Sequence, residues 1–152
     1  MKRLAAAAFV FAAVAATLAS TALAAKPPAK RPADRVVVMY FHRTQRCPTC
    51  LKMGSYSEEA VKKGLAKQVK DGSVEFHYID FQNKKNAALT KGYKISGPAL
   101  IVAKVEKNKV KQYKDLKDIW TKVREKPKFI KYVCENVEAY LKKPKAVTAD
   151  AE

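Results

Sequence analysis

The sequence predicts an α/β fold in which helices flank a central, mixed sheet of four strands. The continuous apolar run from Arg35 to Phe41 predicts a strand that is buried on both faces. Ser73 to Phe81 largely alternates apolar and polar residues, which predicts a second strand. The apolar segments 99–103 and 110–113, with a turn at 106–109, predict a β-hairpin that completes the sheet.

The helices are predicted between and after these strands. Residues 50–70 carry a partial helical stripe of apolar residues, which Gly54 and Gly64 weaken and which Ser57 could restart as an N-cap. Residues 83–93 predict a short helix, and 116–141 a longer helical region that Pro127 divides. The order is strand, helix, strand, helix, strand, strand, helix. Its first two strand–helix–strand steps predict parallel pairing, and the hairpin adds an antiparallel edge.

Both ends of the chain differ in composition from this domain, which we place at 35–143. A basic start, an apolar stretch and a small-x-small site predict a signal peptide over 1–24, cleaved near Ala24–Ala25. An uncleaved N-terminal anchor is the alternative. Residues 25–34 read as a linker rich in Pro and Lys, and 144–152 as a flexible tail. We therefore expect a periplasmic or secreted protein.

The formal net charge is +17, from 31 Lys and Arg against 14 Asp and Glu. The basic residues are scattered and mostly Lys, with no nucleic-acid-binding motif among them. We expect a solvated basic surface and no nucleic acid partner. Peripheral contact with an anionic envelope surface stays open.

Cys47-Pro48-Thr49-Cys50 lies between the first strand and the first helix. Thiols three residues apart at a helix start share one side of the helix, within disulfide reach. The helix N-terminus favours a thiolate, and an exported protein meets an oxidising compartment. This arrangement predicts a redox pair. A permanent disulfide or half of a zinc site are the alternatives.

The residues around the pair suggest how it is tuned. Positive charge on Arg43 and Arg46 would lower the pKa of Cys47. His42 would tune the thiolate or donate a proton, or else simply end the strand. The irregular spacing of Cys and His predicts no metal site. The third cysteine, Cys134, lies in an apolar stripe and reads as a buried, inert thiol, and Trp120 reads as core.

Three segments resemble the thioredoxin-like superfamily. They are Val36–Phe41 with the Cys pair, Tyr78–Asn83, and Tyr93–Val102. More narrowly, residues 40–52 are similar to a small exported family labelled as the nitrophenyl compound nitroreductase subunit ArsF. The resemblance implies a thioredoxin-like fold with Cys47 as nucleophile and Cys50 as resolving thiol. It also implies a cis Pro98 beside the pair, with the backbone of Gly97 facing the substrate.

The chain departs from the superfamily pattern at three points. Arg46 stands where thioredoxins usually have Trp before the first Cys. The first strand offers Val38, Met39, Tyr40 and Phe41 where thioredoxins place a buried Asp that assists proton transfer from the second Cys. The dipeptide inside the motif is Pro-Thr rather than Gly-Pro. No flavin or nicotinamide fingerprint is present, so we expect no cofactor.

These observations favour an exported thiol–disulfide oxidoreductase. It would exchange electrons with a protein disulfide or dithiol through Cys47 and Cys50, and with a redox partner that the sequence does not identify. One alternative is a non-catalytic thioredoxin-like module that binds a partner and holds a structural disulfide. Another is a metal or metalloid binder that uses the same thiols.

Overall fold

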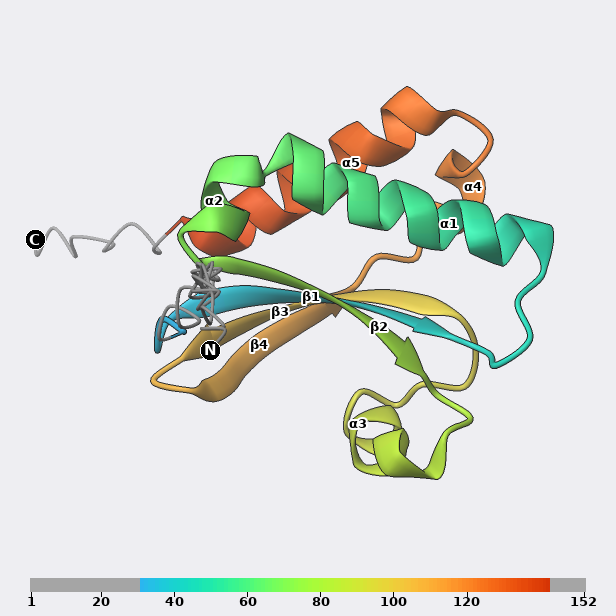
Figure 1. The fold of residues 1–152 in the computed structure, drawn as a ribbon, viewed down its shortest axis with the longest axis horizontal. Coiled ribbons are helices and arrows are strands. Elements are labelled where there is room, and N and C mark those ends of the chain that lie inside the picture. The colour runs from blue at the N-terminus through green and yellow to red at the C-terminus, as the bar shows by residue number, and fades with distance from the viewer. Residues whose placement is uncertain (1–30, 143–152) are drawn as a thin grey trace, which may run out of the picture.

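A mixed four-stranded sheet with helices along one face forms the centre of the protein in the computed structural model, which describes residues 31–142 (Figure 1). The strand order is β2-β1-β3-β4. The strands are β1 (Arg35–His42), β2 (Val74–Asp80), β3 (Ala99–Glu106) and β4 (Lys109–Asp115). The predicted signal peptide, the first part of the linker and the C-terminal tail lie outside the described residues.

The helices form two groups (Figure 1). On one face of the sheet lie α1 (Pro48–Glu59), the π-helical turn η1 (Ala60–Gly64), α2 (Ala66–Lys70) and α5 (Lys126–Leu141). The short helix α4 (Ile119–Lys122) precedes α5, and the turn η2 (Lys84–Asn86) with α3 (Ala87–Gly92) lies beyond the end of β2. The α/β class and the four-stranded mixed sheet are as predicted. In the part of the chain that the structure describes, no helix has the length and apolar character needed to cross a membrane.

The pairing of the strands agrees with the prediction at two of three interfaces. β1 pairs with β2 in parallel, and β3 pairs with β4 as an antiparallel hairpin. The prediction that the second strand–helix–strand step is also parallel is wrong, because β3 runs antiparallel to β1. The six residues of α3 span only about 9 Å, whereas the seven of β2 span about 23 Å. This short helix does not carry the chain back along β2, and β3 begins at the end of the sheet where β2 ends, since Phe41 pairs with both Ile79 and Ala99.

The helix after the Cys pair does not restart at Ser57. The Ser57 hydroxyl is fully buried and donates to the carbonyl of Met53 at 2.7 Å, inside a continuous α1. Gly54 allows the helix to approach the rings of Tyr40 and Tyr78, since a Cβ there would lie 2.9 Å from each. The two glycines flagged as weak points are thus places where the helix packs closely, and Gly64 plays the same role against α5.

The hairpin turn is built by two left-handed residues. Lys107 and Asn108 have φ of 51° and 61°, as in the type I′ turns that match the twist of paired strands. The ladder has an irregularity at Lys104/Val105. The hairpin is confirmed, with longer strands than predicted.

The C-terminal helical region is divided at Pro127, as predicted, because the proline lies in the first turn of α5. Cys134 on α5 is half-buried, and its thiol donates to the carbonyl of Ala60 at 3.4 Å. The expectation for Trp120 is wrong, since its side chain is 46% exposed. Its neighbour Ile119 is the residue of α4 that enters the core.

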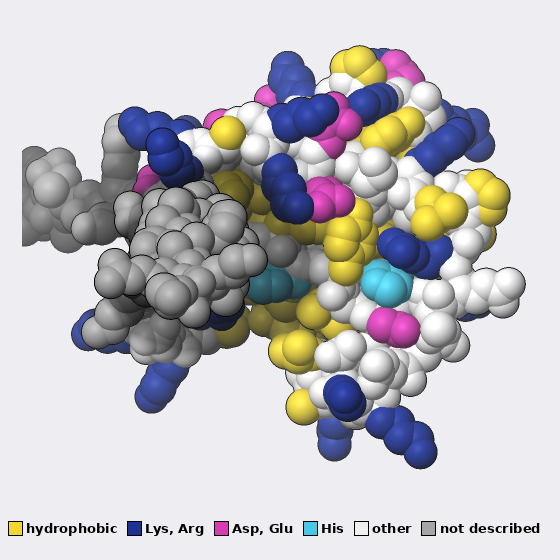
Figure 2. All heavy atoms as spheres, viewed as in Figure 1, with side chains coloured by type: hydrophobic (Ala, Val, Ile, Leu, Met, Phe, Trp, Pro, Cys, Tyr) yellow, Lys and Arg dark blue, Asp and Glu magenta, His cyan; other side chains and the backbone are white. Residues whose placement is uncertain are grey.

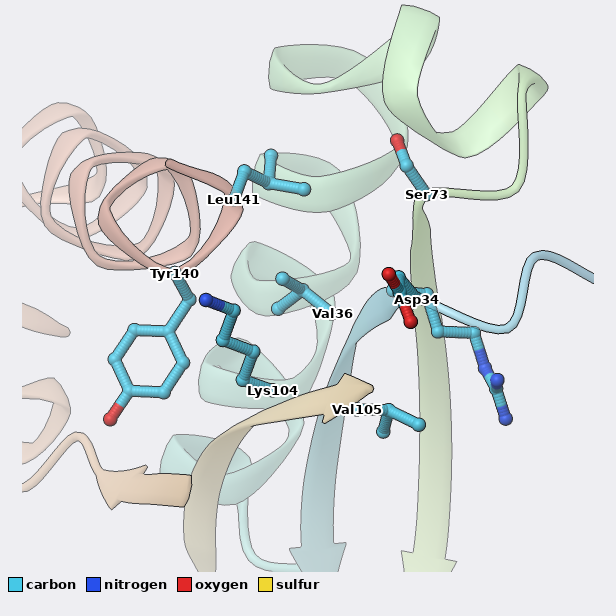
Figure 3. Close-up of a pocket in the computed structure, with 8 residues that line it drawn as sticks. Asp34, Val36, Ser73, Lys104, Val105, Tyr140 and Leu141 are labelled. Atoms are coloured by element: carbon cyan, nitrogen blue, oxygen red, sulfur yellow. The ribbon is translucent and has the colours of Figure 1, made fainter. Parts of the chain in front are cut away.

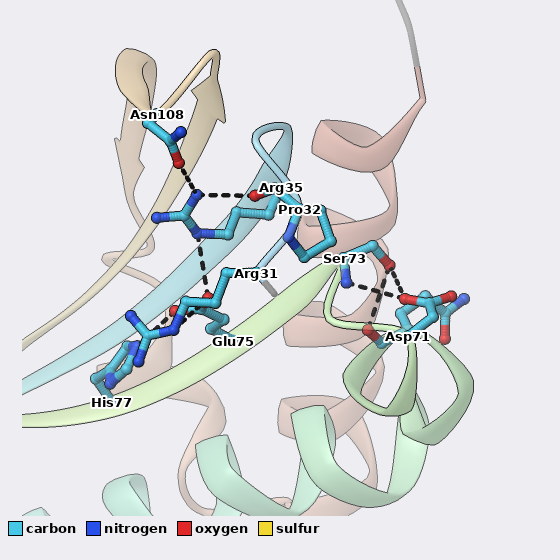
Figure 4. A network of polar contacts seen from close by, with 9 residues as sticks. Arg31, Pro32, Arg35, Asp71, Ser73, Glu75, His77 and Asn108 are labelled. Carbon is cyan, nitrogen blue, oxygen red and sulfur yellow. Dashed lines mark hydrogen bonds and ion pairs between the residues drawn. The ribbon is translucent and has the colours of Figure 1, made fainter. Parts of the chain in front are cut away.

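The end of the sheet where β1 begins is held by an ion-pair network (Figure 4). The guanidinium of Arg35 lies 3.1 Å from Glu75 on β2 and donates to the side chain of Asn108 in the hairpin turn at 2.9 Å. A small cavity of about 150 Å³ lies nearby, bordered by Val36, Lys104 and Tyr140 among others (Figure 3). These contacts fix three strands at the opposite end of β1 from the loop that carries the Cys pair.

Candidate functional site

The two cysteines of the motif lie at the start of α1, after the loop that connects it to β1. Cys47 is the N-cap of the helix and Pro48 occupies its first turn, where a missing N–H has no cost. The backbone N–H of Cys50 donates to the Cys47 sulfur at 3.2 Å. The two sulfurs are 2.6 Å apart. Both thiols therefore share one side of the helix start, as the spacing predicts.

The two thiols have different environments. Cys47 is exposed, and hydrogen bonds from the Cys50 thiol and then from the Cys50 backbone lower the pKa of its own thiol. Cys50 is buried, and burial followed by its hydrogen bond to Cys47 raises its pKa. The outer sulfur is thus the one that ionises first. The helix N-terminus acts in the same direction.

The loop before Cys47 is tied to the end of β2. The Thr44 hydroxyl donates to the Asp80 carboxylate at 2.7 Å, and the Thr44 N–H donates to the Gln82 side chain at 3.0 Å. The bond from Thr44 is the main reason that the pKa of Asp80 is lowered. These contacts hold an exposed loop in one position at the entrance to α1.

The basic residues near the pair do not all act as expected. Arg43 borders the hollow beside the sulfurs, and its charge offsets a small part of the rise in the Cys50 pKa that burial chiefly causes. Arg46 lies over the ring of Tyr78, 5.5 Å from the centroid. Hydrogen bonding between the thiols, and not the arginines, is the main cause of the lowered Cys47 pKa.

His42 ends β1 beside aromatic rings. Its Nδ1 lies 2.8 Å from the Arg43 carbonyl, and its ring is 5.9 Å from Tyr78 and 6.3 Å from Tyr40. His42 thus lies at the strand end among aromatic rings, and its role toward the thiolate stays a prediction.

Tyr40 on β1 lies beneath the start of α1. Its ring is fully buried, and its hydroxyl donates to the Cys50 carbonyl at 2.8 Å. Burial, followed by charge on the two thiols, raises the pKa of Tyr40. In the sequence, Tyr40 stood out only as one of the residues found where an Asp was expected. In the structure, its hydroxyl links β1 to the start of α1.

Pro98 lies beside the pair, where the resemblance puts it. It borders a hollow of about 250 Å³ together with Cys47 and Cys50. The expected cis peptide bond is absent, since no bond within residues 31–142 is cis. The trans form is the more stable for X–Pro bonds, by about 0.5–1 kcal/mol. Gly97 borders an adjoining hollow of about 290 Å³, and a Cβ added to it would meet open space.

Trp120 is the residue of the site that sequence reasoning missed. It borders the hollow at the sulfurs and also the adjoining one. Helical spacing gave no such signal, because Trp120 falls on the same helical face as its buried neighbours Ile119 and Val123.

The described part of the chain offers no cluster of potential metal ligands. No three His, Cys, Asp or Glu side chains of residues 31–142 group closely enough to hold an ion.

Lys and Arg are dispersed among other residues on the face drawn in Figure 2.

Comparison with known proteins adds little. The chain matches no family model and no curated protein sequence. Five chains of solved structures match, among them one titled "Structure of a malarial protein", with 18% sequence identity and a TM-score of 0.37. That match covers 60% of this chain and 96% of the other. A similarity at this level carries no argument about fold or function.

Proposed function

We propose that this protein is a thioredoxin-like thiol–disulfide oxidoreductase that exchanges two electrons with a protein disulfide or dithiol. One observation carries the proposal: an exposed thiol of lowered pKa lies 2.6 Å from a buried thiol of raised pKa at the start of a helix. A pair held only as a structural disulfide has no need of this asymmetry. Redox pairs depend on it, since the thiolate is the attacking species.

The surrounding fold supports the same proposal. A parallel β1–α1–β2 unit followed by an antiparallel hairpin, with the Cys pair after β1 and Pro98 opposite, is compatible with a thioredoxin-like arrangement. The trans bond at Pro98 and the buried Tyr40 are departures from that pattern.

The chemistry follows from the positions of the sulfurs. The Cys47 thiolate attacks a partner disulfide, so a mixed disulfide forms and one partner sulfur leaves as thiolate. Cys50 then loses its proton and attacks Cys47, which releases the second partner sulfur as thiolate. The partner gains two electrons and the pair is left as a disulfide. The reverse sequence oxidises a dithiol.

The test uses three variants of the full chain, each with one cysteine replaced by serine. Cys47→Ser should abolish exchange with a protein disulfide, whereas Cys50→Ser should accumulate the mixed disulfide visible by non-reducing gel and mass spectrometry. Cys134→Ser is the matched control and should exchange as the parent does. The proposal fails if the parent chain neither reduces a protein disulfide nor oxidises a dithiol, or if Cys50→Ser traps no partner.

A further inference from the structure

Two hollows lie side by side at the Cys pair and share two residues. The first, of about 250 Å³, is bordered by Arg43, Gln45, both cysteines of the motif, Pro98 and Trp120. The second, of about 290 Å³, is bordered by residues 93–99, Asp115 and Trp120. Because Pro98 and Trp120 border both, a partner lying over the sulfurs can continue across them into the second hollow.

Trp120 is held rigidly on an exposed surface. Ile119 and Val123 on either side of it are buried, and the segment before α4 is tied to β3 by the N–H of Leu116, which donates to the Leu100 carbonyl at 2.9 Å. Trp120 as a whole is 46% exposed. A rigid, half-exposed tryptophan offers a large contact area at low entropic cost, and tryptophan is enriched among residues that dominate binding.

The charges that border the hollows indicate what would lie there. Arg43 is the charged side chain that borders the first hollow apart from the thiols. The second is bordered by Lys94 and Asp115, whose charges have opposite signs and largely cancel. The excess positive charge is therefore next to the sulfurs, in a chain of formal charge +17. An acidic residue beside a partner's cysteine fits this distribution.

We propose that Trp120 sets partner specificity. It seats an aromatic side chain of an extended, acidic protein segment whose cysteine reacts at Cys47, while Arg43 contacts an acidic residue of that segment. This inference rests on the proposed thiol–disulfide exchange. In the reacting step a bond forms between Cys47 and the partner sulfur, the partner's S–S bond breaks, and the departing sulfur carries away the electron pair as thiolate.

The test measures the formation of the mixed disulfide in the Cys50→Ser chain, where the product is not resolved. Two peptides carry one cysteine each, activated as a disulfide with 2-mercaptoethanol. In one the cysteine is flanked by glutamate and phenylalanine, and in the other glycine replaces phenylalanine. Mass spectrometry gives the second-order rate constant for each peptide at Cys47.

The aromatic peptide should react about tenfold faster than the glycine peptide, a ratio that one aromatic contact supplies. Trp120→Ala should bring the ratio close to one, and Trp120→Phe should restore most of it. Leu51→Ala is the matched control, because Leu51 is 49% exposed close by in α1 but borders neither hollow, and it should keep the ratio. Arg43→Gln should lower both rates without changing their ratio.

Trp120 also reports binding directly, since it is the one tryptophan of the chain. Its emission should shift when the aromatic peptide is attached at Cys47, and shift less with the glycine peptide. An unchanged ratio in Trp120→Ala overturns the inference and leaves the proposed exchange intact. If neither peptide forms a mixed disulfide at Cys47, the exchange itself is wrong and the inference falls with it.

Discussion

Tyr40→Phe tests the hydrogen bond between Tyr40 and Cys50, because it removes the hydroxyl and keeps the buried ring. The hydroxyl donates to the Cys50 carbonyl at 2.8 Å in a fully buried position. A buried hydrogen bond of this kind contributes about 1 kcal/mol to the free energy of unfolding. For a domain of roughly a hundred residues that loss lowers the melting temperature by about 4 °C near neutral pH.

The same hydroxyl makes the difference between the two proteins depend on pH. Burial raises the pKa of Tyr40 above its ordinary value of 10.0, so the folded chain keeps a proton that the unfolded chain loses. Its stabilising effect is therefore fully present below pH 10 and falls as the pH rises further, by up to about 1.4 kcal/mol per pH unit. An advantage of about 1 kcal/mol would disappear between about pH 10 and pH 11, above which Tyr40→Phe becomes the more stable protein.

The assay is urea denaturation followed by far-ultraviolet circular dichroism, at intervals from pH 7 to pH 11. Linear extrapolation gives the free energy of unfolding of each protein at each pH. If the curves for the parent and for Tyr40→Phe stay parallel up to pH 11, the Tyr40 hydroxyl is not buried in its neutral form, and the stabilising hydrogen bond is not the one described above.

Three further outcomes are expected. Gly64→Ala should lower the free energy of unfolding by about 1 kcal/mol despite its better helix propensity, because the new Cβ would lie 2.6 Å from the Cys134 sulfur, and adding Cys134→Ala should remove most of that loss. Iodoacetamide should modify Cys47 before Cys50, with a pH midpoint below that of an ordinary thiol; equal rates by peptide mapping would contradict the asymmetry. Resolution of a mixed disulfide should accelerate with each pH unit above neutrality in stopped-flow measurements, since Cys50 must first lose its proton, and a flat profile would count against the raised pKa.

Much of the architecture follows from local patterns. The strands, the hairpin turn and the break at Pro127 each rest on a signal within a few residues, such as the continuous apolar run of β1. The direction of β3 does not, because it depends on how far the short helix α3 carries the chain. Residue patterns identify elements, whereas strand direction needs the length of each connection compared with the strand that it must recross.

The site shows the same division between local and distant information. The placement of Cys47 and Cys50 follows from their spacing at a helix start. The contact of Tyr40 with Cys50 and the position of Trp120 beside Pro98 join segments far apart in the chain. Trp120 in particular resembled a core residue because it shares a helical face with the buried residues Ile119 and Val123, and no local pattern distinguishes it from them.

The buried tyrosine also bears on how the pair would work. The Tyr40 hydroxyl already donates to the Cys50 carbonyl, and burial holds its proton in place, so it is a poor acceptor for the proton of Cys50. Within residues 31–142 no carboxylate hydrogen-bonds the Cys50 thiol, whose hydrogen-bond partner is Cys47. An attacking thiol that ionises easily is thus joined to a resolving thiol that does not. In the exchange that we propose, the raised pKa of Cys50 slows the resolving step, because Cys50 must lose its proton before it attacks.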